Sequence, residues 1–398
     1  MRKKSRNPAA PKRQNRLLTL SAALLLLPAA AWSTDISTVK FGTSPGTTTA
    51  TVEADTLPTD PIGGTNGGIL VKDATNQLTH SPDTALYGAS NGNTVNVDGD
   101  VKTNESTYYT VVGGTTVNQA GDSSGNTVNV TAANASTIIG STNNGSVVGG
   151  IAAYLKAAEG SDVPTYTPGK ATGNTVTLTA GTSNTITVNK DLIGGSSTHS
   201  DATGNTVTIH GATAGVSISG NVYGGAADSL TEDPPNPATT GNANENTVTI
   251  DGKVTLSKPV RGGGTYHGNA DGNTVSYDGT EGSVVADITG GSTNIGNANG
   301  NTVKIKGVGT ITSATGGSTY TGDAKDNTVE IGGAVTITEN VRGGTTGSGG
   351  GTAAGNVTGN HVTIGGTAII TENIDGGYSA KGNVSDNHVT FEASTLGK

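Results

Sequence analysis

Ten short segments of the chain alternate polar and apolar residues in the same way. Counted from the Asn in each segment, the second residue is always Val, the fourth is Val, Leu, Ile, Tyr or Phe, and the first and third are polar. The segments are GNTVNV (92–97), GNTVNV (125–130), GNTVTL (173–178), GNTVTI (204–209), ENTVTI (245–250), GNTVSY (272–277), GNTVKI (300–305), DNTVEI (326–331), GNHVTI (359–364) and DNHVTF (386–391). Because successive side chains of a strand point to opposite faces, the pattern predicts ten β-strands with one buried face each.

A second marker, a Gly-Gly pair shortly after an apolar residue, accompanies these segments. Its copies are VVGG (111–114), VVGG (147–150), LIGG (192–195), VYGG (222–225), VRGG (260–263), ITGG (288–291), ATGG (314–317), VRGG (341–344) and IDGG (374–377), with LYGA (86–89) as a degenerate first copy. We interpret the pairs as corners that need positive φ. Arg261 and Arg342, which precede two of the pairs, are interpreted as solvated charges.

The spacing of the markers predicts the architecture. Successive motif Asn residues are 26 to 48 positions apart, which fits a base unit of about 27 residues with insertions. A further alternating stretch lies between the two markers, as in AVTITENV (334–341). Several strands per unit, joined by tight turns, predict an all-β parallel β-helix (β-solenoid) of about ten or more coils stacked about 4.8 Å apart. We expect the recurring Asn to tolerate a left-handed backbone and to pair with the same Asn in the next coil.

Two insertions interrupt the repeat after a Gly-Gly pair, so both are expected to leave the solenoid at one corner. They are IAAYLKAAEGSDVPTYTPGK (151–170), with a short helix expected near 151–159, and the acidic AADSLTEDPPNPATTG (226–241). Loops on a rigid scaffold often carry recognition, and Tyr154 and Tyr166 offer contact surface. The alternative is that both are tolerated surface insertions without a partner. Residues 34–85 lack the motif and are expected to form an N-terminal leader or cap of the solenoid at 86–398.

The N-terminus has the features of a secretory signal peptide. Seven Lys and Arg residues precede an apolar run of 11 residues, Leu17–Leu27, and the small-residue stretch Ala29–Ser33 follows. The apolar run is too short to span a bilayer. The sequence therefore predicts that residues 1–33 are a signal peptide, cleaved after Ser33, and that the chain is exported.

Export changes the charge balance of the chain. Without the seven N-terminal cations, 15 Lys and Arg remain against 31 Asp and Glu, a net charge of −16. Such an acidic chain argues against nucleic acid or an anionic membrane as a partner. The chain has no Cys, so disulfides contribute nothing to its stability.

One motif resembles a catalytic sequence. GDSSGNTV (121–128) comes within one residue of the Gly-Asp-Ser-Gly run around the nucleophile of trypsin-like proteases. It also aligns with GDAKDNTV (322–329) of the repeat, which places Ser123 in an ordinary turn. A Ser nucleophile needs a His base and an Asp on a suitable scaffold, and the repeat leaves no room for one. We interpret Ser123 as structural.

Two residue pairs recur in adjacent units and are candidate sites. Asp251 and Asp278 are expected about 5 Å apart, a separation suited to a Ca²⁺ site or an acid/base pair, although each also fits an Asp-Gly turn. His361 and His388 share the outward position after the motif Asn, but no third metal ligand accompanies them. We therefore assign no catalytic residue, no metal site and no cofactor, and the ligand-binding residues stay unknown.

The units GGSTYTGDAKDNTVEIGG (316–333) and GGYSAKGNVSDNHVTF (376–391) resemble the passenger repeats of bacterial autotransporters. The resemblance covers about residues 86–398. It implies a right-handed β-helix that is exported through an outer-membrane β-barrel at the protein's own C-terminus, and many members of the family are adhesins. The family's barrel has no counterpart before Lys398, which leads us to expect the N-terminal part of a longer protein or the product of a truncated gene.

The resemblance and the loops together imply a non-enzymatic, adhesin-like passenger at the cell surface, at the outer membrane or outside a Gram-negative bacterium. Its expected partners are glycans or proteins of host or bacterial surfaces. One alternative is a β-helix polysaccharide lyase or hydrolase, which needs outward carboxylates and cations clustered in neighbouring coils. The corresponding positions are mostly Thr, Asn and Ser. A second alternative is a structural spacer that binds nothing.

Overall fold

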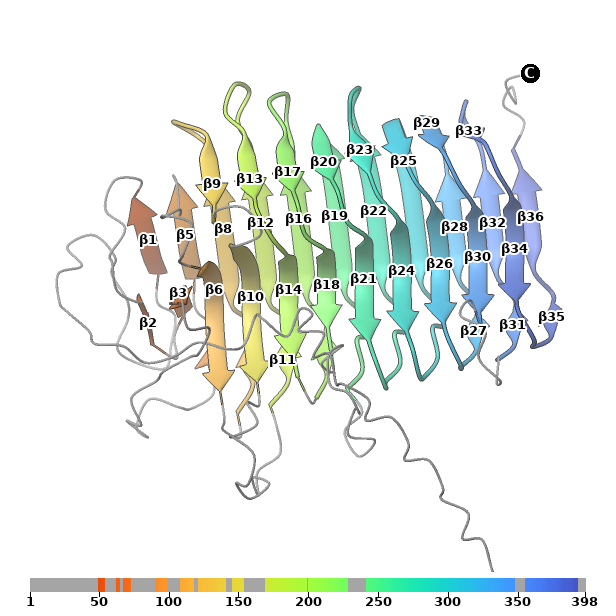
Figure 1. The fold of residues 1–398 in the computed structure, drawn as a ribbon, viewed down its shortest axis with the longest axis horizontal. Coiled ribbons are helices and arrows are strands. Elements are labelled where there is room, and N and C mark those ends of the chain that lie inside the picture. The colour runs from red at the N-terminus through yellow and green to blue at the C-terminus, as the bar shows by residue number, and fades with distance from the viewer. Residues whose placement is uncertain are drawn as a thin grey trace, which may run out of the picture.

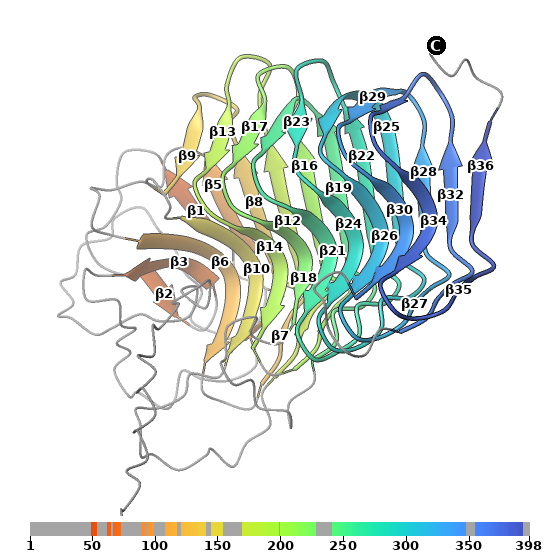
Figure 2. The ribbon, with the colours of Figure 1, turned by 45° about the vertical axis from the view of Figure 1, so that its right-hand side comes forward.

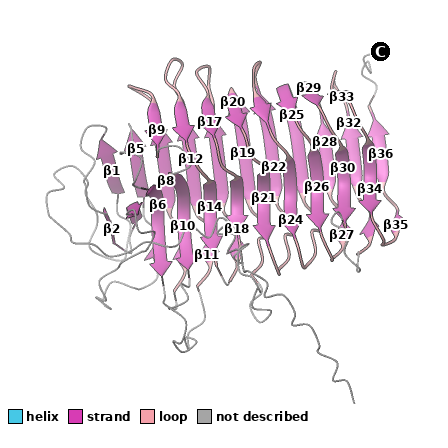
Figure 3. Cartoon of the chain, viewed as in Figure 1, coloured by secondary structure: helices cyan, strands magenta, loops and turns pink. Residues whose placement is uncertain are grey.

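The structure is a computed structural model, and it confirms the parallel β-helix. The residues it describes are 49–53, 62–64, 67–72, 90–92, 94–98, 108–117, 121–140, 145–153, 169–198, 200–227, 241–347 and 355–392. Within them every regular element is a β-strand, and the strands stack side by side in chain order (Figures 1 and 3). The predicted signal peptide, most of residues 34–85, and both Tyr154 and Tyr166 lie outside the described residues.

The ten predicted motif strands are all present. They are β5 (Thr94–Asp98), β8 (Thr127–Thr131), β12 (Thr175–Thr179), β16 (Thr206–His210), β19 (Thr247–Gly252), β22 (Thr274–Gly279), β25 (Thr302–Ile311), β28 (Thr328–Ile331), β32 (His361–Ile364) and β36 (His388–Phe391). They pair in parallel and in register, so that Val176 lies between Val128 and Val207. We call the outward surface of these strands the motif face.

Shorter strands continue the same sheet beyond a turn. They are β9 (Thr137–Ile139), β13 (Ile186–Val188), β17 (Val216–Ile218), β20 (Val254–Leu256), β23 (Val284–Val285), β29 (Ala334–Ile337) and β33 (Ile369–Ile370), while β25 runs through both parts. Their alternating burial, as in the inward Ile186 and Val188 around Thr187, matches the alternation read from the sequence. Seven units therefore contribute two strands to this sheet before the chain turns back, and one further unit contributes the continuous strand β25.

The Gly-Gly pairs lie in a second sheet, which we call the glycine sheet. Its parallel strands are β6 (Tyr108–Val117), β10 (Ser146–Ala153), β14 (Leu192–Ser197), β18 (Val222–Ala226), β21 (Val260–Thr265), β24 (Ile288–Thr293), β26 (Ala314–Thr319), β30 (Val341–Thr346) and β34 (Ile374–Ser379) (Figure 2). Two-residue strands then lead back to the motif strands: β4 (Ser90–Asn91), β7 (Ser123–Ser124), β11 (Ala171–Thr172), β15 (Ala202–Thr203), β27 (Ala324–Lys325), β31 (Val357–Thr358) and β35 (Val384–Ser385).

Inward side chains from all these strands form one continuous apolar core. Val207, Ile209, Val216 and Val222 belong to one unit and are all at most 2% exposed. Each such side chain contributes about 1.5–3 kcal/mol of gross burial energy. A single unit does not enclose its own core, so the stability of the solenoid depends on contacts between neighbouring units.

The motif Asn residues form a buried ladder along the solenoid axis. In each step the Oδ1 of one Asn accepts hydrogen bonds from the backbone N–H and from Nδ2 of the Asn before it. The ladder runs through Asn126, Asn174, Asn205, Asn246, Asn273, Asn301, Asn327, Asn360 and Asn387. The predicted pairing of the Asn residues is therefore confirmed.

The predicted role of the Gly-Gly pairs is wrong. None of the described pairs has positive φ, and each lies inside a strand of the glycine sheet. The pairs are glycine because the Asn ladder and the next strand leave no space. A Cβ on Gly194 would lie 2.3 Å from the carbonyl oxygen of Gly224, and one on Gly195 would lie 2.2 Å from Oδ1 of Asn205.

The positive φ falls on the residue before the motif Asn instead of on the Asn itself. This position is glycine in seven described units, with φ between 62° and 71° at Gly92, Gly125, Gly173, Gly204, Gly272, Gly300 and Gly359. Glu245, Asp326 and Asp386 occupy it in the other three, with φ of 58°, 55° and 56°. The left-handed residue turns the chain into the motif strand.

Most of the extra length of the long units lies between the Gly-Gly pair and one later glycine. That glycine stacks directly on its counterpart in the previous unit, as Gly296 does on Gly268. It follows the second glycine of the pair by 5 residues in four units, as from Gly291 to Gly296, but by 19 residues at Gly169 and 16 at Gly241.

The structure also corrects the predicted helix near 151–159. Residues 151–153 belong to the strand β10, because Ile151 and Ala152 pair with Ser196 and Ser197 of β14. Residues 154–159 lie outside the described part of the chain.

Three N-terminal strands extend the solenoid. β1 (Thr49–Glu53) pairs in parallel with β5 and adds a rung to the motif sheet, with Ala50 and Val52 in register with Val95 and Val97. β2 (Ile62–Gly64) and β3 (Gly67–Lys72) form a hairpin, and β3 pairs antiparallel with β6. At the other end, β36 pairs with β32, which places His388 beside His361 and Phe391 beside Ile364.

Candidate interaction surfaces

The motif face presents regular rows of half-buried hydroxyl groups. Thr occupies the position after the motif Asn in the eight units from β5 to β28. In β12, β16, β19 and β22 the position two residues later is also Thr or Ser, as at Thr177, Thr208, Thr249 and Ser276. Strand geometry sets the rows at about 4.8 Å between strands and about 6.6 Å along a strand. Because β-branched side chains are stiff at χ1, the hydroxyl groups of Thr are held in a fixed pattern.

Charged groups border this hydroxyl area. Beyond β22, Lys304 Nζ lies 3.5 Å from a carboxylate oxygen of Glu330. At the end of the strands, Asp251 and Asp278 occupy neighbouring register positions, as the sequence predicted. Oδ2 of Asp251 lies 2.6 Å from Nδ1 of His210, a partner that the sequence reading missed. The register of β16 on β19 accounts for this contact, because His210 and Asp251 are the fifth residues of aligned strands.

The two late His residues stack on the motif face. The rings of His361 and His388 are nearly parallel, with an interplanar angle of 14° and centroids 5.1 Å apart. Within the described ranges, no three His, Cys, Asp or Glu side chains lie close enough together to hold a metal ion. The pair is therefore a stacked polar contact between neighbouring rungs.

Ser123 lies inside the solenoid. Its side chain is fully buried, its Oγ donates to the carbonyl oxygen of Gly114 at 3.0 Å, and it accepts a hydrogen bond from Nδ2 of Asn126 at 3.1 Å. The hydroxyl group thus joins the Asn ladder to the glycine sheet. The structure agrees with the interpretation of Ser123 as structural, but it places the residue in the strand β7 instead of the predicted turn.

The outward row of the glycine sheet corrects the interpretation of the two Arg residues. Both are half-buried instead of fully solvated. Arg261 donates from Nη1 to the hydroxyl of Tyr223 at 2.9 Å and covers its ring. Arg342 donates from Nε to Asp375 at 3.2 Å and lies over the ring of Tyr378.

The same row is apolar and buried near its N-terminal end. Val112, Val148, Ile193 and Tyr223 are at most 7% exposed and form a cluster with Ile151, separate from the main core. The sequence carried a signal for this cluster, because the residue directly before Gly-Gly is apolar or aromatic in VVGG, VVGG, LIGG and VYGG and is polar or charged later. This second cluster was missed because the pair was interpreted as a corner instead of as part of a strand.

Side-chain oxygens also connect the units at the edge where the long segments leave. Oδ1 of Asn242 accepts from the N–H of Asn269, and Oδ1 of Asn269 accepts from the N–H of Asn297. A parallel row joins Asn244, Asp271 and Asn299 in the same way. Burial raises the pKa of the Asp271 carboxyl, since this row is partly shielded from water. Both rows hold the bases of the long segments in fixed register.

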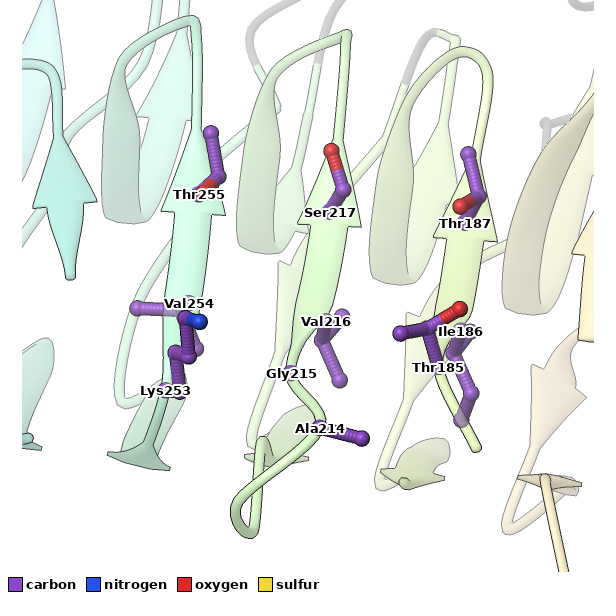
Figure 4. A pocket seen from close by; sticks show the side chains of 10 residues that line it. All are labelled: Thr185, Ile186, Thr187, Ala214, Gly215, Val216, Ser217, Lys253, Val254 and Thr255. Carbon is purple, nitrogen blue, oxygen red and sulfur yellow. The ribbon is translucent and has the colours of Figure 1, made fainter. Parts of the chain in front are cut away.

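A groove crosses three of the short strands. Its volume is about 140 Å³, and it is lined by residues 185–187, 214–217 and 253–255, which form the beginnings of β13, β17 and β20 and the residues just before them (Figure 4). Sites for small-molecule ligands usually enclose about 300–1,000 Å³. The groove is therefore smaller than a typical substrate pocket.

No family model matches the chain, and no curated protein or solved structure matches it. In the part of the chain that the structure describes, no helix is long and apolar enough to cross a membrane.

Proposed function

We propose that this chain is an exported surface protein of the autotransporter passenger type, which acts by binding other surfaces through an elongated β-solenoid. The observation that carries the proposal is the unbroken register from β5 to β36, which keeps the rows of hydroxyl groups and the edge where the long segments leave on one rigid body. Rigid scaffolds of this kind present contact residues at fixed separations.

The chemistry of the motif face favours a neutral, hydroxyl-rich partner. Thr and Ser hydroxyls both donate and accept hydrogen bonds, and β12, β16, β19 and β22 carry no charged group at the two central outward positions. The net charge of −16 after signal-peptide removal disfavours acidic polymers. Cell-surface glycans are the partner class that best meets both conditions.

Residues 1–33 support the export part of the proposal. A basic N-terminal head, an 11-residue apolar run and small residues before Ser33 are the parts of a signal peptide. A globular intracellular protein has no use for such a leader. Detection of the chain on the surface of intact cells by protease shaving would test this part directly.

The binding part is tested with two deletions that the stacked glycines define. Removal of residues 154–167 brings Gly150 and Asn174 ten positions apart, and removal of residues 228–238 does the same for Gly225 and Asn246. This is the separation between Gly291 and Asn301 in a short unit. A separate variant, Thr208→Lys with Thr249→Lys, changes only the motif face. Binding of each purified chain to a glycan array and to cultured cells is compared with the wild type.

The outcomes separate the possible surfaces. Lost binding after the deletions assigns recognition to the long segments, and lost binding in the double Lys variant assigns it to the motif face. If the wild-type chain binds neither glycans nor cells, the adhesive function is rejected and the chain is a spacer. Unchanged far-UV circular dichroism in both variants serves as the folding control.

A further inference from the structure

The groove across β13, β17 and β20 is hollowed at a glycine. The N–H of Ile186 donates to the carbonyl oxygen of Gly215. The N–H of Val216 donates in turn to the carbonyl oxygen of Lys253 in the next unit. Gly215 therefore lies between Thr185 and Lys253, whose side chains are exposed, and has no side chain to fill the space between them. Its φ is 108°, so a residue with a Cβ would be strained at this position and the hollow stays open.

A row of hydroxyl groups follows one side of the hollow. Thr187, Ser217 and Thr255 are aligned by the register of the three strands, and they alternate with buried residues, so they point outward (Figure 4). None of the three hydroxyl groups has a hydrogen-bond partner among the residues that the structure describes. Each both donates and accepts hydrogen bonds. Strand spacing sets neighbouring groups about 4.8 Å apart, so one ligand can contact the whole row.

The other side of the hollow adds an apolar contact and a nitrogen donor. Ala214 and Lys253 both line the groove, and its ten lining residues include no acid. In the described ranges no carboxylate lies within ion-pair distance of Lys253. Ligand sites typically combine apolar contacts with a few polar groups that fix the orientation of the ligand. A sugar ring matches this set, because its C–H groups are apolar and its hydroxyl groups donate and accept.

The size and direction of the groove limit what it holds. Its volume of about 140 Å³ is below the 300–1,000 Å³ of a typical site for a complete small molecule. It crosses the strands, and the strands stack along the rod (Figure 1), so a chain that enters the groove follows the rod axis. The groove therefore suits one residue of a longer chain.

We propose that this groove binds one neutral sugar residue of a glycan chain that lies along the rod axis. The inference rests on the proposed function and names a site that contacts the glycan. The row of hydroxyl groups exchanges hydrogen bonds with the sugar, Lys253 donates to one of its oxygens, and Ala214 contacts its C–H groups. The net charge of −16 after signal-peptide removal repels an acidic sugar, and an ion pair with one exposed Lys offsets little of this repulsion.

A variant that fills the hollow tests the site. Ser217→Tyr places a large side chain at the centre of the hydroxyl row, and Tyr is well accepted in strands. Thr336→Tyr is the matched control, since Thr336 belongs to the same outward row on β29 and lies outside the groove. The purified exported chain is applied to an array of neutral glycans, each paired with its sialylated form. Isothermal titration calorimetry then measures the dissociation constant for the neutral glycan that binds best.

We expect the wild type to prefer the neutral glycans. Ser217→Tyr should raise the dissociation constant by about tenfold or more, and Thr336→Tyr should bind like the wild type. Lys253→Gln keeps a nitrogen donor and removes the charge, so it should change the constant by less than about threefold. Unchanged far-UV circular dichroism in all three variants is the folding control.

Three results would overturn the inference. They are a wild type that binds no neutral glycan, a Ser217→Tyr variant that binds as well as the wild type, and a preference for sialylated forms that disappears in Lys253→Gln. If the wild type still binds cells in any of these cases, only the groove is rejected and the proposed function stands. If it binds neither glycans nor cells, the proposed function fails as well.

Discussion

Asn273 accepts two hydrogen bonds from Asn246 through one atom. Its Oδ1 lies 2.9 Å from the backbone N of Asn246 and 3.0 Å from Nδ2 of the same residue. Both residues are fully buried, so water cannot replace either bond. The two Asn residues are 27 positions apart in the chain and adjacent in space. The Asn273 side chain thus provides the acceptor for the backbone N–H of Asn246, and the side chain of Asn301 does the same for Asn273.

This relationship predicts a large effect of a small substitution. Asn273→Ala removes the acceptor for two buried donors of Asn246 and leaves a cavity, so it should lower the free energy of unfolding by about 3 kcal/mol or more. Asn294→Ala, at an exposed loop position, is the control and should change it by less than about 0.5 kcal/mol. Guanidinium denaturation of both variants measures the difference. Equal effects would show that the ladder does not stabilise the fold.

The Gly-Gly pair should not tolerate a methyl group. A Cβ at Gly291 would lie 2.3 Å from the carbonyl oxygen of Ala270 and 2.5 Å from Oδ1 of Asn301, so Gly291→Ala should be destabilising by several kcal/mol or prevent folding. At Gly332 a Cβ would meet nothing within 4 Å and φ is not positive, so Gly332→Ala should be neutral or stabilise by about 0.4–1 kcal/mol. The melting temperatures of the two variants provide the test. A stable Gly291→Ala protein would contradict the packing described here.

The left-handed turn before the motif Asn predicts a stabilising change. Glu245 has φ of 58°, which costs about 1–2 kcal/mol for a residue with a Cβ. Glu245→Gly should raise the free energy of unfolding by about 0.5–1 kcal/mol, after the greater chain entropy of glycine in the unfolded state is subtracted. The reciprocal variant Gly272→Ala, at the same turn in the next unit, should lower it by about 1 kcal/mol or more. Changes of the same sign in both variants would refute this account of the turn.

Asp271 predicts a pH-dependent effect. Burial raises the pKa of its carboxyl above the ordinary value of 3.8, so ionisation is less favourable in the folded chain than in the unfolded chain. The charged form therefore destabilises the fold, and this penalty is present at neutral pH and disappears as the pH falls through the raised pKa to below 3.8. Asp271→Asn keeps the Oδ1 acceptor for the N–H of Asn299 and removes the charge.

We therefore expect Asp271→Asn to be more stable than the wild type at pH 7 and equally stable at about pH 3. Thermal denaturation at both pH values measures the difference between the two proteins. Asp122→Asn is the control, since its Oδ1 also accepts a hydrogen bond from the next unit, at Lys170, in an exposed setting. A gain for Asp271→Asn that persists unchanged at pH 3 would rule out ionisation as its cause.

The periodic part of the fold was predictable because one physical rule repeats at fixed positions. Alternation identified Val275 as inward and Thr274 as outward, and the structure buries the first and half-exposes the second. The pairing of Asn246 with Asn273 followed from the same alignment of units. Each prediction needed only the repeat and the geometry of a parallel strand.

The failures concern packing and contacts between units, which the sequence of a single unit does not display. Gly194 and Gly195 are glycine because Asn205 and the next strand occupy the space, and a sequence does not display that volume. The contacts of Arg261 with Tyr223 and of His210 with Asp251 join different units whose lengths differ, so the register had to be known first. The helix expected near 151–159 was inferred from local composition, whereas pairing with β6 and β14 extends the strand β10 to Ala153.

The stacked glycines at Gly169, Gly241, Gly268 and Gly296 have an evolutionary consequence. Any number of residues inserted before such a glycine leaves the following strand, its partners and its Asn in place. A gene for this protein can therefore gain, lose or exchange a surface segment in one unit without compensating changes in the others. Sequence diversity should accumulate along this single edge, while the rest of each unit stays under the constraints of packing. Such a scaffold allows one segment to vary in sequence and length at little cost in stability.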